Sequence, residues 1–467
     1  MNRKQITPVI LLIAILLLAI YFGTTYTLGL KFLISLIILW LLFLLLDPVW
    51  LFYLLILLFW FPYSFNYLFF KEIFVNAYIG EVLSYVLLIM YIGLGFVKNS
   101  NIFKRLSDTP LKTSIFIFIL ANFISYVFFA DKNNDFAYIL FRQNCFYSIA
   151  IYILAANIIS KIDKAKKAIF LLIISYLILA SFLYYSFYFR VNLVDVLSEG
   201  DRLGGVFVLF GKYPIAIGCI FVGIMLANLI PFVAMFIFSN EKTYYKLLSI
   251  LVLIMFSTTM IYSGTRSAWI GALVGVFPLL SYFFKNKKLS FFSKFLFFIG
   301  LIIVVLTLYY VVKYSIEINN YLIFRFDSLK RLSGDESLLS RLDIWMAGFQ
   351  EFLKNPLGLG FREVYQMGAS VKYPHSLYIG ILLSSGFLGF MGFFSFIILW
   401  FKKVVSFIKT SDGSVNLFLS AAQGSTVAFL VTGIFEDPTH NSNIIMPMMW
   451  LIWGISIALC RTRTENA

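Results

Sequence analysis

Long apolar runs, separated by short polar stretches, dominate the chain from one end to the other. A membrane-spanning helix needs about 20 such residues, so most runs are long enough to cross a bilayer. The breaks are least clear within 7–97 and within 206–239, where Pro214 and Pro231 interrupt one run. The pattern predicts about 14 transmembrane helices (12–14), at roughly 7–22, 29–46, 48–70, 72–97, 111–130, 136–160, 166–190, 206–239, 244–262, 264–284, 291–315, 374–402, 414–436 and 442–461.

The composition agrees with this pattern and excludes other classes of protein. The chain is 61% hydrophobic and 13% charged, with a mean hydropathy of +0.92. A soluble chain is about 45–50% apolar and about 25% charged, so a water-soluble core cannot absorb this excess. Disorder and collagen-like repeats are excluded for the same reason. We therefore expect an all-α polytopic integral membrane protein.

The net charge of +15 is unevenly divided between the two predicted sides. Fourteen spans put both termini on one side, and the segments on that side hold 21 basic and six acidic residues. The segments on the opposite side hold 16 of each, so the whole surplus lies on one face. Basic loops stay in the cytoplasm, which places the N- and C-termini there. The basic charge is thus explained by topology, and we expect no nucleic-acid partner.

Two segments on the outer side are too long to be simple turns, namely 190–205 and about 316–373. The second contains an amphipathic helix, because apolar residues recur there at steps of three and four. Such a helix lies on the lipid interface or covers a cavity between spans. Its predicted apolar face consists of Leu338, Leu342, Trp345, Phe349 and Phe352.

A short outer turn between two apolar runs carries Arg266 and three hydroxyl residues, Ser263, Thr265 and Ser267. A guanidinium, hydroxyls and the free amides of a helix start together form a good anion pocket. The alternative is an interfacial arginine that extends to lipid headgroups. We favour the anion pocket, because charged residues on apolar spans are expensive and are commonly functional.

Three further basic residues on the outer side are weaker candidates for binding an anionic substrate. Arg202 precedes Gly204 and Gly205, which allow close backbone approach, and Lys212 lies in the same stretch. Arg341 sits at the edge of the amphipathic helix. For Arg202 and Arg341, a solvated surface charge is an equally good interpretation.

The chain has two histidines, and His375 is the stronger candidate. It follows Pro374 and opens a predicted span, so its ring lies beside a helix N-terminus. The positive end of the helix dipole disfavours the imidazolium, which leaves a neutral, proton-accepting imidazole. A structural role at a helix cap is the alternative. We interpret His440, in a short turn near Glu436 and Asp437, as structural.

No nucleotide-binding, dinucleotide-binding, zinc-protease or serine-hydrolase motif occurs in the sequence. The three cysteines form no CxxC and no disulfide framework. We therefore expect no cofactor and no metal. Outer-face arginines and one histidine at a helix start suit a reaction on a phosphate-bearing lipid.

Three segments resemble the O-antigen ligase and O-antigen polymerase superfamily of bacterial lipid-linked glycan transferases. His375-Ser376, nine residues, and then Gly386-Phe-Leu-Gly389 is similar to the ligase signature H-[NSQ]-x9-G-x-x-G. Residues 340–345 with 355–360 resemble the arginine-bearing outer loop, and 263–267 the other arginine motif. Arg202 with the five residues after it, up to Phe207, is a looser match. The resemblance covers roughly 200–400.

The resemblance implies a fold of the membrane glycosyltransferase C type and an undecaprenyl-pyrophosphate-linked glycan as donor. Arg266 and Arg341 would then hold the donor diphosphate, and His375 would activate the acceptor hydroxyl. The expected division is N-terminal transmembrane helices over 1–190, the ligase-like catalytic region over 191–402, and C-terminal transmembrane helices over 403–467. The expected place is the bacterial inner membrane, in pathways of lipopolysaccharide and polysaccharide synthesis for the cell envelope. Fourteen spans suit the polymerases, whereas ligases usually have twelve.

Two other classes of function remain open at this point. One is a multi-pass transporter or flippase for an anionic lipid-linked glycan, which would show charges at mid-membrane depth and two related halves. The other is a structural scaffold, which needs no set of arginines and histidine. The clustering of candidate residues at one face favours an enzyme. Sugar identity, linkage and acceptor are not encoded in any motif.

Overall fold

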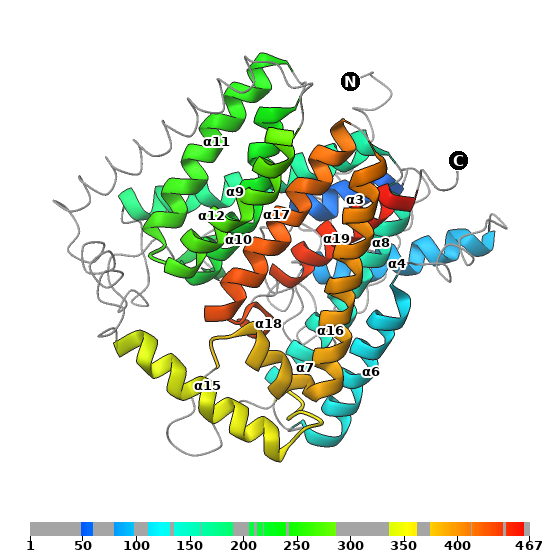
Figure 1. Cartoon of the computed structure of the whole chain (residues 1–467), viewed down its shortest axis with the longest axis vertical. Helices are drawn as coiled ribbons and strands as arrows, with labels where there is room; N and C mark the ends of the chain where they lie inside the picture. The colour runs from blue at the N-terminus through cyan, green and yellow to red at the C-terminus, as the bar shows by residue number, and fades with distance from the viewer. Residues whose placement is uncertain are drawn as a thin grey trace, which may run out of the picture.

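The computed structural model describes residues 48–58, 79–97, 111–130, 135–159, 161–189, 205–209, 213–217, 219–239, 242–285, 336–361, 374–411, 413–441 and 445–461. Nearly all of this part of the chain is helical (Figure 1). The helices are α3 (Pro48–Leu57), α4 (Ile79–Val97), α6 (Lys112–Phe129), α7 (Asp135–Phe141), the π-helix η3 (Arg142–Tyr147), α8 (Ser148–Ile158), α9 (Ile162–Phe189), α10 (Cys219–Phe238), α11 (Thr243–Tyr262), α12 (Arg266–Lys285), α15 (Glu336–Lys354), α16 (Leu377–Thr410), α17 (Ser414–Phe435), α18 (Pro438–Asn441) and α19 (Ile445–Arg461).

Seven helical segments in the described ranges are long and apolar enough to cross a membrane. This confirms a helical, polytopic membrane protein. The predicted runs at 111–130, 244–262, 264–284 and 414–436 correspond within two residues to α6, α11, α12 and α17. The total of fourteen stays a prediction, because the runs at 7–22, 29–46 and 291–315 lie outside the described residues. The seven are Lys112–Phe129, Ala137–Ile158, Ile220–Phe238, Thr243–Tyr262, Arg266–Phe284, Leu377–Thr410 and Ser414–Phe435.

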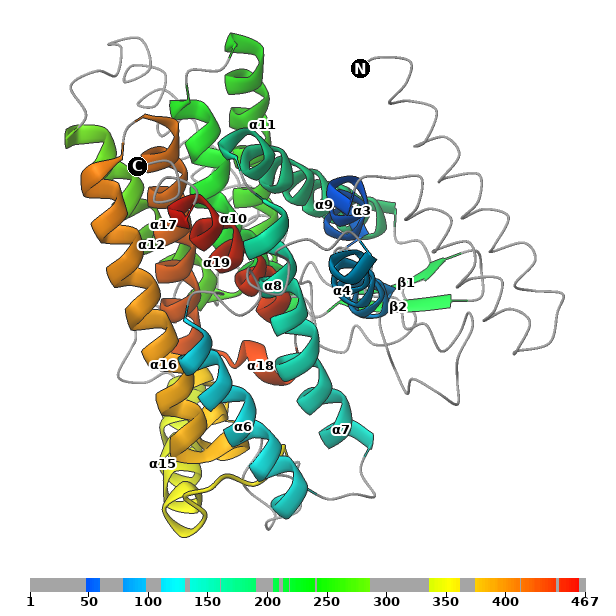
Figure 2. The ribbon, with the colours of Figure 1, turned by 90° about the vertical axis from the view of Figure 1, so that its right-hand side faces the viewer.

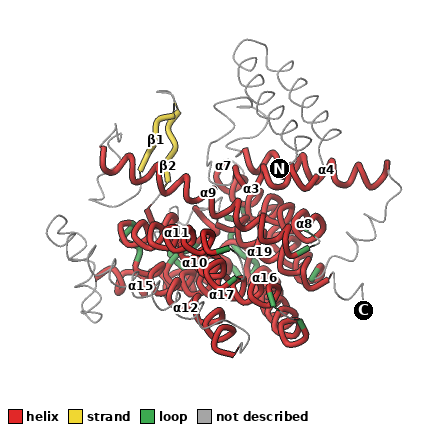
Figure 3. Tube along the Cα trace, turned by 90° about the horizontal axis from the view of Figure 1, so that it is seen from above, coloured by secondary structure: helices red, strands yellow, loops and turns green. Residues whose placement is uncertain are grey.

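The predicted span at 206–239 is wrong in its first third. Gly205–Leu209 (β1) and Tyr213–Ile217 (β2) form an antiparallel hairpin, in which Val206 pairs with Ala216. Figures 2 and 3 show this hairpin beside α9, away from the main bundle. The segment is rich in β-branched and aromatic residues, which favour strands, and high hydropathy alone does not distinguish the two. The helix begins only at Cys219, and the fold is therefore not purely α-helical.

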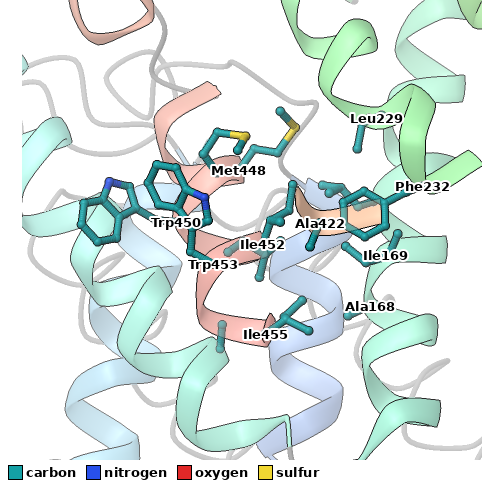
Figure 4. Packing of buried hydrophobic residues seen from close by; sticks show 14 of the residues in the cluster. Ala168, Ile169, Leu229, Phe232, Ala422, Met448, Trp450, Ile452, Trp453 and Ile455 are labelled. Atoms are coloured by element: carbon teal, nitrogen blue, oxygen red, sulfur yellow. The ribbon is translucent and has the colours of Figure 1, made fainter. Parts of the chain in front are cut away.

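The centre of the core is α19, a short helix that is apolar on all sides. Every residue from Ile445 to Cys460 is buried, as a helix surrounded by other helices requires. Trp450 and Trp453 pack edge to face, with ring centroids 5.2 Å apart. Trp453 also donates its indole N–H to Thr426 Oγ1 at 3.0 Å. Side chains of α9, α10 and α17 lie on the other side of α19, next to Ile452 and Ile455 (Figure 4).

Helices α12 and α17 run side by side and approach closely through small residues. A Cβ atom on Gly275 would lie 2.8 Å from the carbonyl oxygen of Gly424, and one on Gly271 would lie 3.0 Å from that of Ala428. Close contact of this kind through a small-xxx-small pattern is typical of helices packed in membranes. As residue numbers fall along α12 they rise along α17, so the pair is antiparallel.

A buried ion pair joins α4 to the π-helix η3. Glu81 is fully buried, and its Oε2 accepts a hydrogen bond from Arg142 Nη2 at 3.2 Å. The hydroxyl of Tyr85 donates to Glu81 Oε1 at 2.9 Å. Single-turn π-helices interrupt α-helices where a local feature outweighs regular bonding. In this chain the π-helix begins at Arg142, the residue that pairs with Glu81 of α4.

Helix α16 is broken at Gly386, the first glycine of the G-x-x-G motif. Gly386 has φ +68° and ψ −170°, which interrupts the regular bonding between turns. The carbonyl groups of Leu383 and Ser384 instead accept hydrogen bonds from Leu359 N at 2.6 Å and Gly360 N at 3.2 Å. Phe387 N donates to Pro356 O at 2.9 Å. The segment after α15 is thereby fixed to α16 by backbone bonds.

We expect the change Gly386→Ala to detach this segment. A Cβ atom there would lie 2.5 Å from Pro356 O, in a backbone conformation that costs a side-chain-bearing residue about 1–3 kcal/mol. The melting temperature of the purified protein in detergent should fall. The control is Gly93→Ala, since a Cβ atom at Gly93 meets nothing within 4 Å. Equal melting temperatures for the two variants would contradict the structural role of Gly386.

Candidate active site

Three helix ends meet beside α15 at one end of the bundle. Helix α17 ends there, α16 begins there, and α15 lies across both, at the lower end of Figure 1. Helix α12 also begins at this end, because it is antiparallel to α17. The sequence had assigned candidate residues to the starts of α12 and α16 and to α15. Their helices therefore converge, although the chain separates them widely.

Glu436 connects two of the predicted site residues. Its Oε1 accepts a hydrogen bond from Arg341 Nη2 at 2.8 Å, and its Oε2 lies 3.2 Å from His375 Nδ1. The Glu436 side chain is 6% exposed, against 22% for Arg341 and 33% for His375. A carboxylate that accepts from Nδ1 fixes the orientation of the imidazole ring and leaves Nε2 as the other ring nitrogen.

The backbone around this carboxylate is fixed on both sides. Glu436 N donates to Thr432 O in the last turn of α17, and Glu436 O accepts from Leu377 N at the start of α16. His375 adopts φ +43°, a left-handed conformation that histidine tolerates better than most residues. Such a conformation persists where surrounding contacts impose it. The ring of His375 is thus directed by its own backbone and by Glu436.

Helix α15 turns Arg341 towards the bundle. Trp345, one turn later, packs against Phe435 with ring centroids 6.0 Å apart, and Phe352 is 8% exposed. The apolar face predicted from the sequence is split in the structure, because Leu342 and Phe349 are exposed. With neighbouring exposed residues they form a second apolar stripe, displaced around the helix from the packed face: Leu339, Leu342, Met346, Phe349 and Leu353.

Arg266 opens α12 at the same end of the bundle as Glu436. Gly271 lies opposite Thr432, so one further turn brings the start of α12 level with Glu436 at the end of α17. Arg266 is partly exposed. The first N–H groups of a helix have no acceptor within it and attract anions. The start of α12, with Arg266 as its first residue, therefore lies at the same level along the bundle as Glu436.

The three hydroxyl residues of this turn face the protein interior. Ser263 Oγ donates to Met260 O at 2.6 Å and lies 3.2 Å from Thr265 Oγ1. Both residues pack against Gly223 of α10. Ser267 is 5% exposed, and its Oγ has no hydrogen-bond partner among the described residues. The same holds for Nε1 of Trp345. Both atoms are enclosed by protein and are not exposed to a substrate in this structure.

Asp437, the next residue after Glu436, is a second buried carboxyl group. It is 2% exposed, and its Oδ1 accepts hydrogen bonds from Thr439 N at 2.9 Å and Thr439 Oγ1 at 2.6 Å. Burial raises the pKa of Asp437 from 3.8 to about 7, although the bonds from Thr439 act in the opposite direction. Gly380 in α16 leaves room for this carboxyl group.

The raised pKa of Asp437 predicts a specific dependence of stability on pH. Between about pH 4 and 7 the folded protein binds this proton more tightly than the unfolded chain. The free energy of unfolding therefore falls as pH rises through that window, by up to about 1.4 kcal/mol per pH unit for one proton. Asp437→Asn removes this contribution. The melting temperature in detergent should therefore fall less between pH 5 and pH 8 in the variant than in the wild-type protein. An unchanged difference would contradict the burial argument.

Some predicted residues lie outside the described part of the chain. Arg202 and Lys212 are among them, as is the side chain of His440, so their roles stay predictions. Within the described residues, no group of three or more His, Cys, Asp or Glu could hold a metal ion. The thiols of Cys145 and Cys460 are free and buried.

No clear signal in the sequence marks Glu436 as a member of the site. It is 95 residues from Arg341 and 61 from His375 along the chain. The one available hint was its position, since Glu436 and Asp437 are adjacent acids at the end of an apolar run. Acidic residues at such a place are expensive unless they are paired.

The apolar helices define an integral membrane protein in which one carboxylate joins an arginine and a histidine at one end of the bundle. The family model for O-antigen ligase matches residues 250–394, which confirms the resemblance to the O-antigen ligase and polymerase superfamily over that region. The matched region contains Arg266, Arg341 and His375, whereas Glu436 lies beyond it. Comparison of the chain with curated proteins finds no match.

Proposed function

We propose that the protein transfers or polymerises glycan from an undecaprenyl-diphosphate-linked donor onto an acceptor hydroxyl. The observation that carries this proposal is the joining of Arg341 and His375 through Glu436. The match to the O-antigen ligase family over residues 250–394 supports the same class of reaction. The proposed enzyme is a membrane glycosyltransferase that needs neither metal nor cofactor.

The leaving group explains the need for arginines. A diphosphate leaves as a stable anion, so its charge must be met by fixed cations and no acid is required to protonate it. Arginine binds phosphate oxygens bidentately, which makes Arg341 and Arg266 suitable.

The acceptor hydroxyl needs a base, and His375 is placed to serve as one. Its Nδ1 is directed at Glu436, so Nε2 is the nitrogen that accepts the proton. Attack by the acceptor opposite the diphosphate inverts the anomeric carbon. Stereochemical analysis of the product tests this step, and retention of configuration would reject it.

We place the active site at the outer face of the bacterial cytoplasmic membrane, with both termini in the cytoplasm. The charge asymmetry of the predicted loops supports this orientation. The exposed apolar stripe of α15 suits a helix that lies against lipid at the membrane surface. In this position α15 holds Arg341 at the level of a lipid-borne diphosphate. The acceptor is a glycan or lipid presented at the same face.

A transporter or flippase for an anionic lipid-linked glycan is the second candidate. The observation that favours it is the ion pair of Glu81 and Arg142, since buried charges between apolar helices are often part of a transport path. Both members of this pair are bonded to each other, which also fits a structural role. The site at the end of the bundle favours the enzyme.

The experiment that tests the proposal uses single alanine substitutions of Arg266, Arg341 and His375 in the native host. Surface glycan length is read on a gel, and the lipid-linked donor is measured on each side of the membrane. Loss of glycan extension with donor accumulated outside supports a transferase. Donor trapped inside indicates a flippase, and wild-type glycan in all three variants, at normal protein levels, rejects the enzymatic proposal.

A further inference from the structure

One carboxylate serves two partners whose proposed tasks conflict. Arg341 is to bind the donor diphosphate, yet its Nη2 donates to Glu436 Oε1 at 2.8 Å. His375 is to accept a proton, and its Nδ1 lies 3.2 Å from Oε2 of the same group. A guanidinium beside a carboxylate offsets the negative charge that the imidazole would otherwise experience. The imidazole of His375 therefore experiences the full negative charge of Glu436 only when Arg341 binds another anion.

The structure indicates which of the three groups can move. Glu436 is held by backbone bonds to both α17 and α16, and its side chain is 6% exposed. His375 is constrained by a left-handed backbone next to the start of α16. Arg341 is 22% exposed on α15, and arginine has a long side chain with several rotatable bonds. Exchange of partners thus requires movement of Arg341 alone.

We propose that Glu436 is a positioning residue that couples donor binding to activation of His375. This inference rests on the proposed function. When a donor arrives, its diphosphate replaces Glu436 as the anionic partner of Arg341. The Glu436 carboxylate then interacts with His375 alone, holds the proton on Nδ1 and stabilises the imidazolium that forms during transfer. The base is therefore strongest when the donor is in place.

The step that follows is balanced without any co-reactant. The acceptor O–H gives its proton to Nε2 of His375, and its oxygen forms a bond to the anomeric carbon. The bond between that carbon and the diphosphate oxygen breaks, and the electron pair leaves with the polyprenyl diphosphate. Among the described residues, the charged groups around His375 are Glu436 and Asp437, which follow α17, and Arg341 on α15. His375 afterwards returns its proton to water.

The change Glu436→Gln separates this role from a purely structural one, because binding of the diphosphate should be kept while glycan transfer is lost. Removing the competing carboxylate frees Arg341, so undecaprenyl diphosphate without a sugar should bind nanodisc-embedded variant at least as tightly as wild type. Glycan transfer in membranes of the native host should fall by about tenfold or more. The pH at which transfer is half-lost on the acid side should be lower in the variant.

Two further variants keep the test decisive. Glu436→Asp retains the charge and should recover part of the transfer rate and of the wild-type pH profile. Glu351→Gln is the matched control, since Glu351 pairs with Lys354 on the same face of the membrane, within α15. It should leave binding and transfer unchanged. Wild-type transfer in Glu436→Gln, or weaker undecaprenyl diphosphate binding together with lost transfer, would overturn the coupling.

Failure of this inference is distinguishable from failure of the proposed function. If wild-type protein neither binds undecaprenyl diphosphate nor extends glycan, the proposed function is wrong, and the coupling, which depends on it, is rejected as well. If wild type does both, and Glu436→Gln retains the wild-type pH profile, the transferase proposal stands and only the coupling is rejected.

Discussion

Replacing His375 with alanine is expected to lower the rate of glycan transfer by about 10²–10⁴-fold, the range for loss of a general base. The reason is that the acceptor hydroxyl is a poor nucleophile until its proton has a destination, and Nε2 of His375 supplies one. Binding of undecaprenyl diphosphate should change little, because the imidazole meets the acceptor and not the leaving group. The measurement is transfer rate and donor affinity on the same membrane preparation.

The second histidine of the chain provides the matched control for this change. His440 lies in α18, on the segment that follows Asp437. His440→Ala should retain transfer, since we interpret this residue as structural. Equal losses in the two variants, with normal protein levels in both, would mean that His375 has no special role.

Replacing Arg341 with alanine is expected to lower the transfer rate by about 10²–10³-fold, as removal of one fixed donor to a developing anion does. In contrast to the histidine change, it should also weaken binding of undecaprenyl diphosphate. Arg341→Lys retains the charge but not the bidentate geometry, so an intermediate rate is expected. Transfer and binding are measured as before, and Arg266→Ala should behave like Arg341→Ala.

Lys354 is the control for the arginine changes, because it lies on the same helix and its side chain is 71% exposed. Lys354→Ala removes a positive charge from α15 without touching the site, and exposed ion pairs contribute little. It should leave transfer unchanged. A comparable loss in Lys354→Ala would show that transfer depends on the general charge of α15 rather than on the position of Arg341.

The pattern of apolar runs predicted most of the helices because a membrane span depends on local composition. The bounds of α6, α11, α12 and α17 agree with the sequence within two residues. The hairpin of β1 and β2 was missed, since hydropathy does not separate an apolar strand from an apolar helix. The break in α16 at Gly386 is a tertiary feature, because it is compensated by bonds to residues 356–360.

The site was predictable in its residue types but not in its geometry. Arg341 and His375 were identified because charged and histidine residues beside apolar spans are expensive. Their shared partner Glu436 could not be identified, because only folding brings α15, α16 and α17 together. The hydroxyls of Ser263 and Thr265 are buried against α10, and their role in substrate binding stays a prediction.

The most direct test of the central claim is transfer by the purified protein in proteoliposomes that contain undecaprenyl-diphosphate-linked glycan and no metal ion. Glycan is added to a second donor molecule or to a supplied lipid acceptor, and undecaprenyl diphosphate is released in equal amount. Extension with donor alone indicates a polymerase, and extension only after an acceptor is added indicates a ligase. Wild-type protein should show one of these activities and the His375→Ala protein neither. Equal transfer by the two proteins, or none by wild-type protein with either acceptor, would contradict the assignment of the Arg341–Glu436–His375 group as the catalytic site.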